Sequence, residues 1–198
     1  MEFLVGVLIV IVLVDLLLTF GVVRRLREHT TRLAELQNGP GGVLPGLRPG
    51  DAVPDFPSVS TTAGGTLSPA ALRNRTSLVA FHSIGCGACE QDAPALADRL
   101  RVEAERGVPA FVVVATQGAD GDAEHIRELA ETMDGLAGVV GEHPGGPVQQ
   151  AFDVGGYPTY FVVGHDGRVV STSPRVSDLP TEAPAVVSAG GHPPNHNS

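Results

Sequence analysis

Two cysteines separated by two residues, Cys86 and Cys89, are the only thiols in the 198-residue chain. A short apolar run, Leu78–Phe81, leads into Cys86, and a helical pattern follows Cys89. This layout predicts Cys86 at the amino end of a helix, where free backbone N–H groups and the helix dipole stabilise a thiolate. Two cysteines one helical turn apart can form a disulfide with little backbone movement. The spacing therefore predicts a pair that changes between dithiol and disulfide.

The two cysteines have different predicted roles. In a dithiol exchange, the amino-terminal cysteine attacks and the second cysteine resolves the mixed disulfide. Cys86 is therefore the predicted nucleophile, and Cys89 is the predicted resolving thiol. Two alternatives are a zinc site, because zinc is also bound by CxxC sequences, and an inert cysteine pair. A structural zinc needs four ligands and the chain has no second CxxC, so we predict neither a metal nor another cofactor.

A second candidate feature is the sequence Tyr157-Pro158-Thr159, at the start of an apolar strand pattern. A proline at this position lacks the N–H group that would join the strand ladder. In the cis form, Pro158 would turn the backbone of Tyr157 outward, where an extended substrate segment could pair with it. An ordinary strand-initiating proline is the alternative. We predict that Tyr157 and Pro158 bind substrate and that the bond between them is cis.

Residues 3–23 form a nearly continuous apolar segment in which Asp15 is the one charged residue. A helix of this length spans roughly 31 Å, enough to cross the hydrocarbon core of a bilayer. The apolar side chains outweigh the cost of inserting Asp15, about 3 kcal/mol. The segment is too long for a signal peptide, and no small-x-small cleavage site follows it. We therefore predict one transmembrane helix in residues 1–23, with residues 3–23 in the lipid bilayer.

Two features of the sequence favour opposite sides of the membrane for the rest of the chain. Arg24, Arg25 and Arg27 follow the apolar segment, and the positive-inside rule would place them in the cytoplasm. A membrane-tethered dithiol domain is more often expected on the oxidising outer face. We expect a single-pass membrane protein with its domain on the extracytoplasmic side.

The net charge of −9 argues against a nucleic-acid partner.

Strand and helix patterns alternate in the rest of the chain. Residues 24–46 predict a helical stalk and a Gly- and Pro-rich linker, residues 47–176 a folded domain, and residues 177–198 a disordered tail. The predicted strands are 77–82, 110–115, 139–140, 158–163 and 168–171, and the predicted helices are 89–106, 122–133 and 147–152. This alternation, with a final hairpin, predicts an α/β fold with a central mixed sheet flanked by helices.

The sequence resembles the thioredoxin-like superfamily, in particular its membrane-anchored TlpA-like and redoxin branch. The methylamine-utilisation redoxins look similar. The resemblance covers residues 47–173 and implies a thioredoxin-like fold preceded by a single amino-terminal transmembrane helix. Its landmarks are Gly50–Phe56, the strand ending at Phe81, the Cys86/Cys89 pair, Pro94 in the first helix, Phe152–Phe161 around Pro158, and His165–Val170.

The resemblance implies a membrane-tethered thiol-disulfide oxidoreductase that uses the redox-active Cys86–Cys89 disulfide. Its expected partners are the thiols and disulfides of other proteins, for which it is a reductant, and an unidentified electron donor. Two alternatives are a thiol peroxidase of the redoxin group and a non-enzymatic redox sensor or adaptor. A peroxidase would need a Pro-x-x-x-Thr/Ser-x-x-Cys loop, and residues 81–85 contain no proline.

Two positions near the cysteines depart from the family pattern. Gly85 stands where the family usually has an aromatic residue just before the first cysteine. Ala80 stands where thioredoxins carry a buried acid that assists proton transfer from the resolving thiol. Glu90, His82 or a water molecule could replace that acid.

Three aromatic residues near Pro158 could form an apolar rim for client proteins, meaning the proteins whose disulfides are exchanged. They are Tyr157, Tyr160 and Phe161. Alternation along the strand places Tyr160 and Phe161 on opposite faces of the sheet, so we expect at least one of them in the core.

Overall fold

The computed structural model describes residues 46–118 and 121–181. The predicted transmembrane helix in residues 1–23, the predicted stalk and linker up to residue 45, and the predicted tail beyond residue 181 lie outside these residues. Within the described ranges, no helix is both long enough and apolar enough to span a bilayer.

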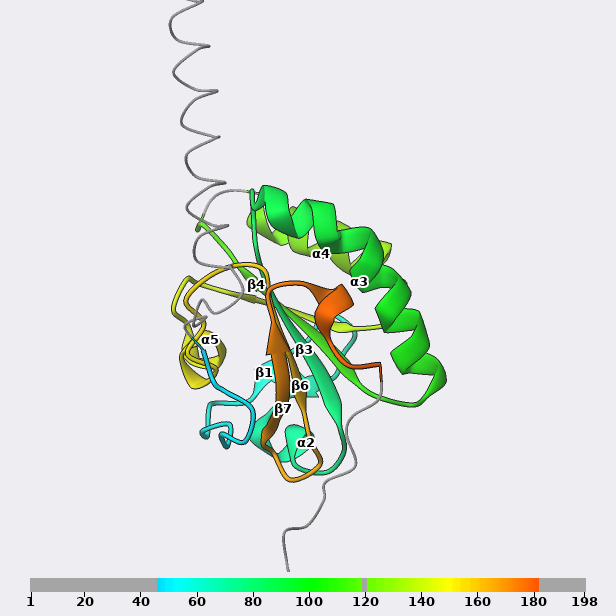
Figure 1. Cartoon of the computed structure of the whole chain (residues 1–198). Coiled ribbons are helices and arrows are strands. Elements are labelled where there is room, and N and C mark those ends of the chain that lie inside the picture. The colour runs from blue at the N-terminus through cyan, green and yellow to red at the C-terminus, as the bar shows by residue number, and fades with distance from the viewer. Residues whose placement is uncertain (1–45, 119–120, 182–198) are drawn as a thin grey trace, which may run out of the picture. The chain divides into compact units, whose positions relative to one another are not determined.

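A five-stranded sheet lies at the centre of the domain, in the order β5-β4-β3-β6-β7 (Figure 1). Strands β3, β4 and β5 are parallel, whereas β6 is antiparallel to β3 and to β7. The sheet is therefore mixed, as the sequence predicts. Its strands are β3 (Ser77–Ser83), β4 (Ala110–Ala115), β5 (Gly138–Glu142), β6 (Thr159–Val163) and β7 (Val169–Ser173).

The helices cover both faces of this sheet. On one face, α3 (Gly87–Glu105) and α4 (Asp122–Thr132) lie together, as Figure 1 shows. On the other face, α2 (Pro69–Leu72) and α5 (Pro147–Ala151) pack together with the segment of the chain that precedes α2. Within residues 46–118 and 121–181, each strand and helix that the sequence predicts is present, with ends within a few residues of the predicted ones. The arrangement is the thioredoxin-like α/β fold that we expected.

Strand alternation divides the buried side chains between two cores. On β3, Val79 and Phe81 face the core with α5, whereas Leu78 and Ala80 face the core with α3. The side chains of β6 divide in the same way. Both faces of each central strand are covered, which explains why these strands are continuous apolar runs in the sequence.

Four short elements of the described residues were not predicted. They are the antiparallel pair β1 (Val59–Ser60) and β2 (Thr66–Leu67), the helix α2, and the 3₁₀ turn η1 (Val176–Asp178). Elements of two to four residues are too short to show a period in the sequence.

The folded domain extends beyond its predicted end at residue 176. Leu179 is buried against the α3 core. The carbonyl oxygens of Pro180 and Thr181 accept hydrogen bonds from Arg99 and Arg106 of α3. The residues from 177 to 181, which the sequence assigns to the tail, are therefore packed on the domain.

Candidate functional site

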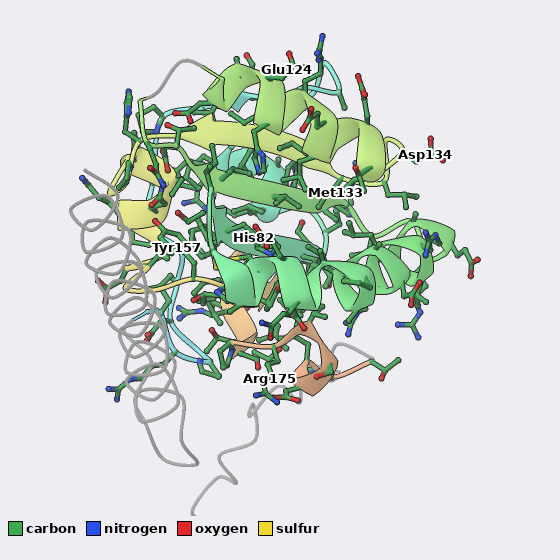
Figure 2. The ribbon with its side chains drawn as sticks, turned by 90° about the horizontal axis from the view of Figure 1, so that it is seen from above. His82, Glu124, Met133, Asp134, Tyr157 and Arg175 are labelled. Atoms are coloured by element: carbon green, nitrogen blue, oxygen red, sulfur yellow. A yellow bond between two sulfur atoms is a disulfide. The ribbon has the colours of Figure 1, made fainter. Side chains whose placement is uncertain are left out.

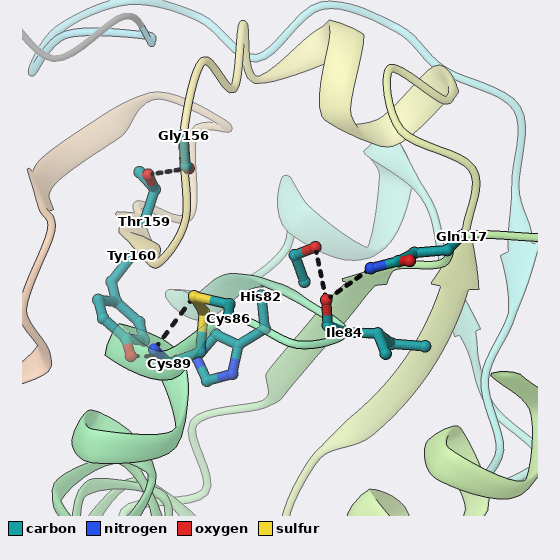
Figure 3. The surroundings of a disulfide bond; sticks show 9 residues. His82, Ile84, Cys86, Cys89, Gln117, Gly156, Thr159 and Tyr160 are labelled. Carbon is teal, nitrogen blue, oxygen red and sulfur yellow. Dashed lines mark hydrogen bonds between the residues drawn. A yellow bond between two sulfur atoms is a disulfide. The ribbon is translucent and has the colours of Figure 1, made fainter. Parts of the chain in front are cut away.

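The two cysteines lie at the start of α3, just after the carboxyl end of β3, and form a disulfide (Figure 3). Cys86 is the N-cap residue of α3, and its sulfur accepts a hydrogen bond from the backbone N–H of Cys89 at 3.1 Å. The positive end of the helix dipole therefore lies at the Cys86 sulfur. In the reduced protein this position stabilises a thiolate on Cys86.

The two sulfurs differ in their exposure. Cys89 is only 4% exposed, whereas Cys86 is partly exposed. An external disulfide can therefore reach Cys86, while Cys89 is placed to react with a sulfur already bound to Cys86. The arrangement agrees with nucleophilic and resolving roles, although the roles themselves remain predictions.

The turn that leads into Cys86 is tied to the neighbouring strand β4. The backbone N–H of Ile84 donates to the carbonyl of Ala115 at 3.2 Å, and the side-chain amide of Gln117 donates to the carbonyl of Ile84 at 3.1 Å. Gly85 follows with a φ of +74°, a conformation that favours glycine. This geometry explains why glycine, rather than an aromatic residue, precedes the first cysteine.

The peptide bond between Tyr157 and Pro158 is cis, and Pro158 is buried directly before β6. Because Thr159 pairs with Phe81 of β3, this loop lies at the same end of the sheet as the cysteines. Figure 3 shows Gly156 and Thr159 in the surroundings of the disulfide. The loop is therefore within reach of a client bound at Cys86, and substrate binding by Tyr157 and Pro158 remains a prediction.

Tyr157 also contacts the helix α5. Its hydroxyl donates a hydrogen bond to the side-chain carbonyl of Gln149. Burial and the nearby Glu142 carboxylate raise the pKa of Tyr157. The tyrosine is therefore a neutral hydrogen-bond donor, and it anchors the proline loop to α5.

A polar cluster of two buried side chains and one partly buried carboxylate lies on the sheet face that α3 covers. The Nε2 atom of His82 and the hydroxyl oxygen of Tyr160 are 3.0 Å apart. The Tyr160 hydroxyl also interacts with the carboxylate of Asp92 on α3. This carboxylate accepts a hydrogen bond from the backbone N–H of Val176 at 3.0 Å. We call His82, Tyr160 and Asp92 the His-Tyr-Asp cluster. Figure 2 shows His82 enclosed by the fold, in contrast to Glu124, which points outward.

The surroundings of this cluster shift the pKa values of two of its groups. Burial lowers the pKa of His82 from 6.5 to about 4, and the Asp92 carboxylate partly opposes that shift. Burial, the hydrogen bond to Asp92 and the charge of Asp92 raise the pKa of Tyr160. Both side chains are therefore neutral near pH 7.

The structure distinguishes among the sequence candidates for a proton acceptor. Ala80, at the position where thioredoxins carry a buried acid, lies opposite Tyr160 in the sheet. Glu90 is exposed, whereas His82 is only 5% exposed and lies in the His-Tyr-Asp cluster. Asp92 was not singled out from the sequence. Its spacing of three residues from Cys89, on the same side of a helix, is the signal that could have found it.

The suggested aromatic rim is wrong for two of its three residues. Tyr160 and Phe161 are both 0% exposed and belong to opposite cores, because β6 is covered on both faces. Tyr157 is partly exposed.

In residues 46–118 and 121–181, no group of three or more His, Cys, Asp or Glu side chains is arranged to hold a metal ion.

Several solved structures share this fold. The thioredoxin domain of a thiol-disulfide oxidoreductase from Bacteroides vulgatus is 20% identical, with a TM-score of 0.55 over 67% of this chain and 93% of that chain. A putative thiol:disulfide interchange protein DsbE from Chlorobium tepidum is 20% identical, with a TM-score of 0.52 over 64% of this chain and 85% of that one. A comparison with curated proteins gives no match.

The sequence itself matches the model of the Redoxin family over residues 48–187, which is most of the chain. The match includes β3, the disulfide at the start of α3 and the cis-proline loop. The chain belongs to the Redoxin family, and with its Cys86–Cys89 pair it is a thiol-disulfide oxidoreductase of the thioredoxin-like type.

Proposed function

We propose that the chain is a membrane-tethered reductase that transfers electrons from a separate donor to disulfides in client proteins. The observation that carries the exchange chemistry is the position of the cysteine pair. Cys86 is accessible at the amino end of α3, and Cys89 is buried one turn behind it. This arrangement separates attack on a client from resolution of the mixed disulfide.

The exchange proceeds in two substitutions at sulfur. The Cys86 thiolate attacks one sulfur of a client disulfide, and the other client sulfur leaves as a thiolate. Cys89 then loses its proton and attacks the Cys86 sulfur, which releases the second client thiol and forms the Cys86–Cys89 disulfide. The donor must return two electrons and two protons to restore the dithiol.

The cis-proline loop supports recognition of an extended client segment. Tyr157 is anchored to α5 through its hydroxyl, and the loop lies at the cysteine end of the sheet. A client strand that pairs with the Tyr157 backbone would bring its disulfide to Cys86. Main-chain pairing of this kind selects for extended structure more than for sequence.

The membrane attachment and the extracytoplasmic location belong to the same proposal. They are supported by the apolar segment of residues 3–23 and by the redox chemistry of the site. The arginines after that segment favour the opposite orientation.

Trapping of mixed disulfides tests the exchange function. The Cys89→Ala variant lacks the thiol that resolves the mixed disulfide. We therefore expect it to accumulate mixed disulfides through Cys86 with many client proteins. The Cys86→Ser variant, which keeps one cysteine, should trap few or none. One stoichiometric partner would instead indicate an adaptor. Rapid reaction of the pair with hydrogen peroxide, without trapped clients, would indicate a peroxidase.

Labelling of intact cells with a membrane-impermeant maleimide tests the location and the direction of electron flow. Labelling of Cys86 and Cys89 without added reductant is the expected result, because a donor keeps an outward reductase reduced. Labelling only after dithiothreitol would indicate an oxidase or a resting sensor. Protection until the cells are lysed would place the domain in the cytoplasm and contradict the proposed location.

A further inference from the structure

The resolving step requires a proton acceptor that the exchange scheme does not specify. Only the thiolate of Cys89 can attack the mixed disulfide, so the thiol must first lose its proton. Cys89 is 4% exposed, which limits the access of solvent water to its sulfur. A group inside the protein is therefore better placed than bulk solvent to take the proton.

The buried side of α3 directs Cys89 toward one face of the sheet. Leu96 and Leu100, which lie two and three turns further along, share that side of the helix and pack in the core with Ala80 of β3. Strand alternation places His82 on the same sheet face as Ala80. Figure 3 draws His82 and Tyr160 together in the surroundings of the disulfide.

The groups that face this region come from three elements. β3 contributes His82, β6 contributes Tyr160, and α3 contributes Asp92 one turn after Cys89. Glu90, the acid next to Cys89, is exposed, and Ala80 supplies no acid. Of the three groups, His82 is the neutral one with a basic nitrogen. The Tyr160 phenol stays protonated, and two hydrogen-bond donors, the Tyr160 hydroxyl and the Val176 N–H, already point at the Asp92 carboxylate.

We propose that His82 accepts the proton of Cys89 during resolution, and that Tyr160 and Asp92 are positioning residues that hold and stabilise the imidazole. The proposal rests on the exchange function above and specifies a catalytic residue for it. The Cys89 proton moves to the imidazole as the Cys89 sulfur attacks Cys86. The client sulfur takes the electron pair of the broken S–S bond and leaves as a thiolate. The imidazolium then returns its proton to solvent.

Charge pairing makes this transfer compatible with the buried site. Burial disfavours an isolated imidazolium, but the proton arrives together with a negative charge on Cys89. The Asp92 carboxylate adds a further stabilising charge, because it acts on His82 in the direction that favours protonation. Burial thus keeps His82 neutral before the step, and the Asp92 charge stabilises its cation during the step.

Stopped-flow reaction of the reduced full chain with Ellman's reagent separates the two steps. Attack by Cys86 releases a first coloured thiolate, and resolution by Cys89 releases a second one at a rate independent of reagent concentration. The test variant is His82→Gln, because glutamine can still hydrogen bond to Tyr160 but has no basic nitrogen. We expect it to slow the second release at least ten-fold near pH 7, with the first release within about two-fold of the wild type.

The pH dependence of the second release distinguishes a base from a structural residue. In His82→Gln, solvent must take the proton, so the rate should rise about ten-fold per pH unit below the pKa of the thiol. The wild-type profile should be shallower. Tyr160→Phe, which keeps the ring and removes the hydroxyl, should slow the second release by a smaller factor with little change in the first.

Matched variants complete the design. His165→Gln alters an exposed histidine in the turn between β6 and β7 and should leave both releases unchanged. A second release that is equally fast in His82→Gln, or slowed with an unaltered pH profile, overturns the proposal. Slowing by Glu90→Gln instead would assign the role to that acid. If the wild-type chain released no coloured thiolate at all, the exchange function itself would fail.

Discussion

At the scale of single residues, the backbone around the cysteines is as specific as the thiols themselves. Cys86 caps α3 with its own sulfur, and Gly85 supplies the left-handed turn that brings the chain from β3 into the helix. The family pattern of an aromatic residue before the first cysteine does not fit this conformation. Steric strain at position 85 therefore limits which side chains can border the site.

Replacement of Gly85 by alanine should lower the free energy of unfolding by about 1–2 kcal/mol, because an L-residue is strained at a φ of +74°. Crowding adds little, since the nearest atom to an added Cβ would be Nε2 of Gln117 at 3.8 Å. Urea unfolding measures the effect. Gly87→Ala, in the first turn of α3, has open space and should be neutral or stabilising. Equal effects at the two positions would contradict this account.

His82 should make stability depend on pH between about 4 and 6.5. The folded protein keeps His82 neutral down to its lowered pKa of about 4, whereas the unfolded chain takes up a proton below 6.5. The contribution is therefore fully present above pH 6.5 and is lost as the pH falls to 4, by about 3 kcal/mol in total. The difference in unfolding free energy between pH 7 and about pH 4.5 measures it.

The His82→Gln variant isolates this contribution from the titration of carboxylates. It should lose less stability than the wild type between those two pH values. His165→Gln, at an exposed position, should behave like the wild type. An identical pH dependence in the wild type and His82→Gln would show that the histidine is not held neutral by the fold.

At the scale of elements, the short helix α5 connects the proline loop to the sheet. The carboxylate of Glu142, at the end of β5, accepts the backbone N–H groups of Val148 at 2.8 Å and Gln149 at 3.1 Å. The side-chain carbonyl of Gln149 in turn accepts a hydrogen bond from the hydroxyl of Tyr157. An added Cβ at Gly146 would overlap the Glu142 side chain, so this side chain fills the space beside the helix start. The buried acid positions α5 and, through it, the loop.

Replacement of Glu142 by glutamine should destabilise the protein by about 1–3 kcal/mol. The amide keeps one acceptor oxygen but turns an N–H₂ donor toward backbone donors, so one buried N–H loses its partner. Equilibrium urea unfolding measures the loss. Glu128→Gln on the exposed side of α4 should change stability by less than about 0.5 kcal/mol. A similar small effect at Glu142 would contradict its role in positioning α5.

At the scale of the whole molecule, the direction of electron flow and the stability of the fold are linked. A protein that oxidises its partners is more stable in the dithiol state, whereas a reductant is more stable in the disulfide state. We therefore expect the oxidised protein to unfold at a higher urea concentration than the reduced one. Each 1.4 kcal/mol of difference corresponds to about 30 mV in reduction potential.

The Cys86→Ser variant is the control for this comparison. It cannot form the internal disulfide, so added reductant should not change its unfolding midpoint. A dithiol form of the wild type that is more stable than its disulfide form would make the chain an oxidant. That outcome would leave the exchange chemistry in place and contradict the proposed reductase role.

Local patterns in the sequence predicted much of this protein. The spacing of Cys86 and Cys89, the apolar run before them and the helical pattern after them identify the reactive pair and its position at a helix start. Alternation between apolar strands and amphipathic helices predicts the mixed α/β sheet. These features depend on residues close together in the chain, which is why the sequence alone was sufficient for them.

Only the tertiary structure decided which distant residues complete the site. His82 and Tyr160 are 78 positions apart and meet because β3 and β6 pair in one register, while Asp92 reaches them because α3 packs on that face. The burial of both Tyr160 and Phe161 likewise depends on coverage of the sheet from two sides. Such contacts are fixed by strand order, register and helix packing, which residue types and local spacing do not specify.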